Sequence, residues 1–280
     1  MIMKKILFLA TLCGLVACSS PIDDMPAAEQ SKQITFSVSE SIPMSRATLA
    51  DACSRLSYFR CTDGEVVTEV HQSDTDTGFG TVTDNMEYGT HEIYFVGYNS
   101  TTPVSFEAED EGYIYTFDKV SDTFSYYAEV TIDKTSDESQ TITMPRRVAR
   151  FEMVATDALP TNLATMDIRI EGAATALNAE TGKGTAEVVQ TKSITIPAAN
   201  IGKTDCTFIA YAFLLDDTAT LTVTLTAKDA DGATIQSHTL TDVEMETNYI
   251  TRYTGNFFAS GIGSQVSAST EWTGVKENEL

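Results

Sequence analysis

The segment ITFSVS, residues 34–39, decides the fold class, because its side chains alternate strictly between apolar and polar. Ile34, Phe36 and Val38 are apolar, and the residue after each of them is Thr or Ser. Successive side chains of a strand point to opposite faces of a sheet, so this alternation indicates a strand with one buried face. An amphipathic helix would instead repeat about every 3.6 residues.

Short runs rich in Val, Ile, Thr, Tyr and Phe, which favour strands, recur along the rest of the chain. Asp63-Gly64 and Asp231-Gly232 separate neighbouring runs, and Asp-Gly favours a two-residue hairpin turn. Residues 48–53 predict one helical turn, and no long amphipathic helix is indicated. The further predicted strands are residues 56–61, 66–71, 93–98, 113–117, 126–132, 141–144, 148–156, 166–171, 193–197, 208–214, 221–228, 234–240 and 249–258. Many short strands with turn signals between them predict an all-β protein made of β-sandwiches.

The chain divides best near Pro145, into two parts of ordinary domain size. We predict an N-terminal β-sandwich domain over residues 32–145 and a C-terminal β-sandwich domain over residues 146–280. No convincing sequence repeat relates the two halves. Arg146, Arg147 and Arg150 form the densest basic cluster of the chain. They are interpreted either as charge partners at the domain joint or as charges that protect an exposed edge strand.

The first 17 residues have the pattern of a bacterial lipoprotein signal peptide. Lys4 and Lys5 precede an apolar run over residues 6–17, which has the length of a secretory signal and is shorter than the ~20 residues of a membrane-spanning helix. The run ends in LVAC, residues 15–18, which resembles the lipobox where a signal peptidase cleaves before a cysteine. Cleavage between Ala17 and Cys18 would leave Cys18 to carry the lipid. The alternative is an ordinary secretory signal followed by a chance cysteine.

Residues 18–31 predict a polar tether between the lipid and the first strand, because they contain two prolines and few apolar side chains. Asp23 and Asp24 resemble the surface-export signal of Bacteroidetes lipoproteins. Several acyl chains on Cys18 would hold the protein stably, since a single chain gives only marginal membrane binding. The sequence therefore predicts a lipid-anchored, surface-exposed protein of the cell outer membrane.

The composition argues against nucleic acid as a partner and gives no catalytic pattern. The formal net charge of −22 repels phosphate backbones, while 42% hydrophobic residues are ample for packed cores. Cys53, Cys61 and Cys206 have no zinc-site spacing, and we expect them to be thiols. The start of a calcium loop at residues 74–78 lacks the later Glu ligand, and no phosphate-binding loop, HExxH helix or GxSxG elbow occurs. We expect no enzyme activity, no cofactor and no metal.

Two stretches carry a family resemblance: MPRRVARFEMVATDALPTNLATMDIRIEGAATALNAETGKG, residues 144–184, and VEMETNYITRYTGNFF, residues 243–258. Together with the lipobox, they resemble the fimbrillin-associated anchor and minor-subunit family of Bacteroidales. The resemblance implies a lipoprotein with two tandem transthyretin-like β-sandwich domains. Relatives in that family polymerise into pili by strand exchange, after an Arg-specific protease removes an N-terminal strand. Family members serve as stalk, tip or membrane-anchor subunits.

On this resemblance, residues Ile34, Phe36 and Val38 belong to the candidate exchangeable strand, and other fimbrial subunits are the expected partners. Ser45-Arg46-Ala47 resembles the stalk-subunit cleavage site, with cutting between Arg46 and Ala47; the alternative is an uncut loop. We expect a fimbrial anchor or minor structural subunit. The alternative function is a glycan- or nutrient-binding surface lipoprotein, which would need exposed, coplanar Tyr or Trp272 side chains.

Overall fold

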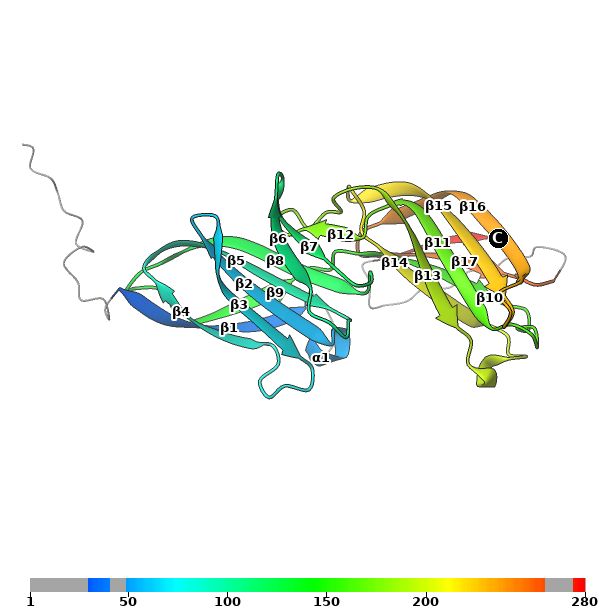
Figure 1. Cartoon of the computed structure of the whole chain (residues 1–280), viewed down its shortest axis with the longest axis horizontal. Helices are drawn as coiled ribbons and strands as arrows, with labels where there is room; N and C mark the ends of the chain where they lie inside the picture. Colours follow the sequence, from blue (N-terminus) through cyan, green and yellow to red (C-terminus); the bar gives the residue numbers. More distant parts are fainter. Residues whose placement is uncertain (1–29, 41–48, 260–273, 280) are drawn as a thin grey trace, which may run out of the picture.

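The computed structural model describes residues 30–40, 49–259 and 274–279, and this part of the chain is almost entirely β-structure. Figure 1 shows its two halves lying end to end, with a small sheet where they meet. In the described ranges, helix is confined to α1(Leu49–Ala52) and the 3-10 turn η2(Ala198–Asn200). No helix within those ranges has the length and apolar character needed to cross a membrane.

The first half consists of two sheets packed face to face. One sheet has the strand order β4-β1-β9, and the other has the order β3-β2-β5-β8. Alternate residues of each strand face the core between the sheets, which explains the period of two in the sequence. The strands are β1(Ser31–Glu40), β2(Arg55–Thr62), β3(Glu65–Ser73), β4(Thr81–Glu87), β5(Gly89–Tyr98), β8(Thr123–Ile132) and β9(Ser139–Met144).

The second half repeats this architecture and adds one strand, β18, at the edge of one sheet. Its sheets have the orders β14-β10-β17-β18 and β13-β11-β15-β16. β10 pairs antiparallel with β14 and parallel with β17, just as β1 pairs antiparallel with β4 and parallel with β9. The duplication shows only in topology, because a sandwich requires matching alternation rather than matching residues. The strands are β10(Ala149–Ala155), β11(Thr165–Ala173), β13(Val188–Thr195), β14(Cys206–Ala212), β15(Thr218–Lys228), β16(Thr234–Glu246), β17(Tyr249–Gly255) and β18(Gly274–Glu279).

A third, three-stranded sheet joins the two halves. β6(Ser105–Glu109) and β7(Gly112–Thr116) form a hairpin inserted in the first half, and β12(Ala176–Asn178) from the second half pairs antiparallel with β7. Beneath this sheet, Tyr115 belongs to the same buried cluster as Leu177 and Phe213. The halves therefore share both a sheet and a hydrophobic core. The predicted boundary at residues 145/146 falls in the connection between β9 and β10 and stays a prediction.

The all-β prediction is confirmed, and each predicted strand overlaps an observed one. Four strands were not predicted: β4, β6, β12 and β18. The sequence does not indicate β4, because its apolar alternation is interrupted by Asp84, which is polar but buried between Val82 and Met86. β13 spans residues 188–195 rather than 193–197 and is largely exposed, so its apolar pattern is weak.

One of the two predicted Asp-Gly turns is wrong. Asp63 and Gly64 have φ angles of 53° and 78° and connect β2 to β3 as the predicted two-residue turn. The connection from β15 to β16 is longer and spans residues 229–233. There the Asp229 carboxylate accepts hydrogen bonds from the backbone N–H groups of Asp231 and Ala233 at 3.1 and 2.8 Å. A side-chain acceptor thus stabilises a wider loop.

Candidate functional site: the first strand and its groove

The candidate exchangeable strand is the central strand of its sheet and is well buried. Ile34 and Phe36 have no exposed surface, and Val38 is 8% exposed. The Phe36 ring centre lies 5.4 Å from that of Phe95 and 5.7 Å from that of Tyr58, on the facing sheet. The alternation seen in the sequence therefore places the side chains of Ile34, Phe36 and Val38 in the core of the first half.

Both backbone edges of β1 are hydrogen-bonded. The antiparallel ladder to β4 runs from Ser31–Glu87 to Ser37–Thr81, and the parallel ladder to β9 runs from Thr35–Ser139 to Glu40–Met144. Removal of β1 would leave two strands with unpaired inner edges and an apolar slot between them. Such an opening is the template that an incoming strand can fill by β-augmentation.

The other predicted site residues lie outside the described part of the chain. Cys18 and the signal-cleavage pair Ala17-Cys18 precede residue 30, and the possible protease site Arg46-Ala47 lies in residues 41–48. The segment 41–48 directly follows β1, so the possible cleavage site is placed between β1 and the remainder of the sandwich. Lipidation and both cleavage events stay predictions.

A buried ion pair beside β1 was not anticipated from the sequence. Arg60 on β2 donates from Nε to Asp84 Oδ2 at 2.7 Å, and the Tyr58 hydroxyl donates to the same oxygen at 2.9 Å. Burial raises the pKa of the Tyr58 phenol, and the adjacent Asp84 carboxylate raises it further. The network ties β4 to the opposite sheet, so one wall of the groove is held independently of β1.

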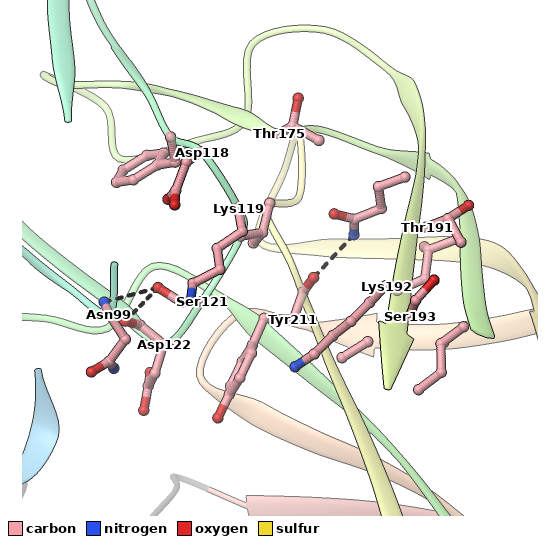
Figure 2. Close-up of a pocket in the computed structure, with 16 residues that line it drawn as sticks. Asn99, Asp118, Lys119, Ser121, Asp122, Thr175, Thr191, Lys192, Ser193 and Tyr211 are labelled. Atoms are coloured by element: carbon pink, nitrogen blue, oxygen red, sulfur yellow. Dashed lines mark hydrogen bonds between the residues drawn. The ribbon is translucent and has the colours of Figure 1, made fainter. Parts of the chain in front are cut away.

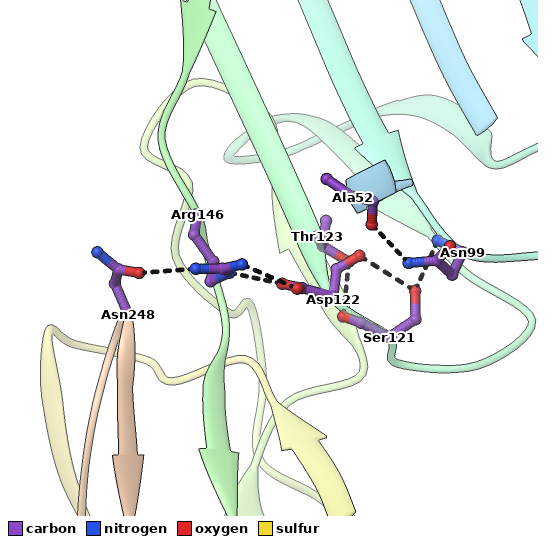
Figure 3. A network of polar contacts seen from close by, with 7 residues as sticks. All are labelled: Ala52, Asn99, Ser121, Asp122, Thr123, Arg146 and Asn248. Carbon is purple, nitrogen blue, oxygen red and sulfur yellow. Dashed lines mark hydrogen bonds and ion pairs between the residues drawn. The ribbon is translucent and has the colours of Figure 1, made fainter. Parts of the chain in front are cut away.

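Arg146 lies at the junction of the two halves, as Figure 3 shows. Its Nε and Nη2 donate to the two carboxylate oxygens of Asp122 at 2.7 and 3.0 Å, and Nη1 donates to Asn248 Oδ1 at 3.3 Å. The guanidinium carbon lies 4.7 Å from the Phe124 ring centre. Burial raises the pKa of Asp122, an effect that its bonds to Arg146 oppose. Arg146 therefore acts as a charge partner at the joint, and the exposed-edge interpretation is wrong for this residue.

The other two arginines of the cluster are also engaged. Arg147 donates from Nε to Ser125 Oγ at 3.0 Å, and Arg150 pairs with Glu152. Glu152, which is 2% exposed, also accepts from Arg252 Nε at 2.6 Å. A buried carboxylate held between two guanidinium groups keeps its charge compensated. All three arginines of the basic cluster thus serve the packing of the joint and the sheet that follows it.

The abundant tyrosines do not form an exposed platform in the described ranges. Tyr94, Tyr98 and Tyr115 are at most 1% exposed and pack in the shared core, while Trp272 lies outside those ranges. Their number is explained by packing, since aromatic side chains bury large apolar areas. Within the same ranges, no group of three or more His, Cys, Asp or Glu residues is arranged to hold a metal ion.

Residues 71–278 match the model of a family described as a family of unknown function (DUF6562), and the chain belongs to this family. No curated protein matches the chain. Solved structures with a similar fold include several from Bacteroides. The structure of a "putative adhesin" from Bacteroides ovatus has a TM-score of 0.52 and 12% identity, covering 74% of this chain and 77% of that one.

Two further solved structures resemble the chain more distantly in sequence or in fold. A structure described as "putative polysaccharide binding proteins (DUF1812)" from Bacteroides thetaiotaomicron has a TM-score of 0.51 and 11% identity, covering 74% of this chain and 79% of that one. The fimbrial anchor protein Mfa2 from Porphyromonas gingivalis has 14% identity and covers 75% of this chain and 83% of that one, with a TM-score of 0.36. At these identities the likeness extends to the fold alone.

Proposed function

We propose that this protein is a surface-exposed outer-membrane lipoprotein that acts as a fimbrial anchor or minor structural subunit. Acyl chains on Cys18 would hold it in the membrane, and it would assemble with other fimbrial subunits by β-strand complementation. Its role would be structural rather than enzymatic.

The observation that carries this proposal is the position of β1. A strand at the start of the described chain occupies the centre of a sheet, contributes Ile34 and Phe36 to the core, and precedes a segment that contains Arg46. A strand at an end of the chain can be replaced by a strand from another chain without rethreading the fold. The vacated groove would offer backbone edges for affinity and apolar pockets for alternate side chains.

Two roles differ in the fate of Arg46. In a stalk-type subunit, cutting after Arg46 frees β1 and also severs the chain from its lipid. In an anchor, the uncut chain keeps both β1 and the acyl chains, and it binds its neighbour through another edge. We favour the anchor role, because the Arg46 match rests on few residues.

Mass spectrometry of the N-terminus separates these roles. Protein is recovered from sheared fimbriae and from washed outer membranes of the native cells. A dominant membrane form that begins at acylated Cys18 supports the anchor role. A dominant form in sheared material that begins at Ala47 would replace it with a stalk or tip role.

Strand complementation at β1, which the stalk-type role requires, is tested on the purified full chain with an Arg-specific protease and a labelled peptide of residues 31–40. After cutting, the peptide should exchange into the protein, whereas a peptide with Phe36→Ala should bind much more weakly. The Arg46→Gln variant is the matched control, since it should resist cutting at this site and accept no peptide. Equal capture of peptide by the cut protein and the Arg46→Gln variant would contradict the mechanism.

A further inference from the structure

A cleft of about 880 Å³ lies where the second half meets the first. Its walls are β13 and β14, the edge strands of the two facing sheets of the second half, and its cover is the connection 117–122 from the first half. Figure 2 shows side chains from all three segments around it. The volume falls within the ~300–1,000 Å³ that is usual for small-molecule sites. The site is separate from β1 and its groove.

Two lysines in this acidic chain line the same cleft. Lys119 comes from the covering connection and Lys192 from β13, and neither makes an ion pair within the described ranges. The Lys192 ammonium lies 5.6 Å from the ring centre of Tyr211 on β14. Partial burial lowers the pKa of Lys192, and the positive charges of Lys119 and Arg150 lower it further. An anion placed between the lysines would relieve this repulsion.

The carboxylates near Lys119 and Lys192 do not neutralise the charge of these two lysines. Asp122 lines the cleft, but both of its oxygens accept hydrogen bonds from Arg146. Asp118 is exposed and accepts from the Ser100 hydroxyl at 2.8 Å. Arg150 is paired with Glu152. Two lysines against the single uncompensated Asp118 leave the cleft locally positive, in a protein whose formal charge is −22.

The remaining lining offers hydroxyl groups and an apolar surface. The side chains of Thr175 and Thr191 make no hydrogen bond in the described part of the chain. Gln190 uses its amide nitrogen on the Tyr211 carbonyl oxygen at 3.0 Å and has its side-chain oxygen left as an acceptor. The half-buried Phe117 and Val120 supply the apolar part of the lining, whereas Ile168 and Ile170 lie beneath it with no exposed surface. Hydroxyl-rich ligands with apolar C–H faces match this combination of an aromatic ring, apolar contacts and free hydrogen-bonding groups.

We propose that this cleft binds a short acidic oligosaccharide, with a sugar carboxylate between Lys119 and Lys192 and a sugar ring against Tyr211. The carboxylate would accept hydrogen bonds from the two ammonium groups. Ring hydroxyls would pair with Thr175, Thr191 and the free oxygen of Gln190. A binding site of this kind would add ligand recognition to a structural subunit, and it does not depend on strand exchange.

The test is isothermal titration calorimetry on the purified full chain, with trigalacturonic acid as the acidic probe and galactotriose as its neutral counterpart. The acidic trisaccharide should bind at least about tenfold more tightly than the neutral one. The double variant Lys119→Gln/Lys192→Gln should lose that advantage. Lys203→Gln is the matched control, because Lys203 is exposed and hydrogen-bonds Asn200 outside the cleft.

Other outcomes would overturn the proposal. Binding of neither sugar, equal binding of both sugars, or an acidic preference that survives in the double variant would each refute it. Tighter binding of a hexaglutamate peptide than of trigalacturonic acid, abolished in the double variant, would assign the cleft to an acidic peptide instead. Urea midpoints of all variants show whether they remain folded. None of these results bears on cleavage at Arg46, so the fimbrial proposal is tested separately.

Discussion

The Phe36→Ala substitution most directly tests how much the burial of β1 contributes to the free energy of unfolding. The side chain has no exposed surface, and its ring contacts Tyr58 and Phe95 on the facing sheet. Truncation of a buried Phe to Ala typically costs 3–5 kcal/mol, so we expect about 4 kcal/mol here. With a urea dependence of about 2 kcal/mol per molar, the midpoint of the affected transition should fall by about 2 M.

The assay is urea unfolding followed by circular dichroism, with hydrogen exchange at β2 and β5 to assign the transition to the first half. Because the two halves share a core, the transition that involves β1 must be identified before its midpoint is compared. Ser37→Ala is the matched control, since Ser37 lies on the same strand with its side chain exposed. A surface change of this kind should alter stability by less than about 0.5 kcal/mol.

A Phe36→Ala midpoint equal to that of Ser37→Ala would refute the reasoning. It would mean that β1 contributes little to the core. A groove left by β1 would then have no strong preference for an apolar strand, and strand complementation at this site would lose its energetic basis.

Three further predictions follow from buried groups and from the predicted lipid anchor. In the folded protein, Cys206 should react with iodoacetamide first, because Cys53 and Cys61 are buried and burial raises the pKa of Cys61 to about 11. On unfolding, a chain that begins at residue 18 and carries Cys18→Ser should gain three additions, whereas a single addition would reveal a disulfide. Arg146→Ala should lower stability in urea by about 3–5 kcal/mol, since it leaves Asp122 buried without its partner, and a loss below about 1 kcal/mol would contradict this role. Cys18→Ser should shift the protein out of washed membranes in cells that lack other pilus subunits, and its retention there would exclude the lipid anchor.

The cysteine prediction depends on pH in a defined direction. Thiolate is the reactive form, and a raised pKa keeps the Cys61 thiol protonated until the pH approaches about 11. Its alkylation in the folded state should therefore stay slow through neutral pH and rise only under strongly alkaline conditions. Rates for Cys61 in the folded protein that equal those in urea at pH 8 would contradict the burial seen here.

Local pattern in the sequence determined most of the strands of this protein and one of its two predicted Asp-Gly turns. Ile34, Phe36 and Val38 indicate a buried face because the side chains of a strand alternate between its two faces. Asp63-Gly64 fits a turn that needs two positive φ angles. These features depend on neighbouring residues only. The same local pattern does not predict β4, because an aspartate such as Asp84 is expected at the surface and is buried here only through its ion pair with Arg60.

The pairing of strands and the joining of the halves were decided only by the tertiary structure. Phe36 lies opposite Val82 on one side and Gln140 on the other, and nothing near residue 36 specifies either partner. Lys119 and Lys192 likewise meet in one cleft through the packing of one half against the other. Such contacts join residues far apart in the chain, where the gain from burying apolar surface and pairing charges offsets the entropy of closing long loops. The sequence alone therefore indicates which strand faces are buried, whereas the packing of the complete fold decides which strands cover them.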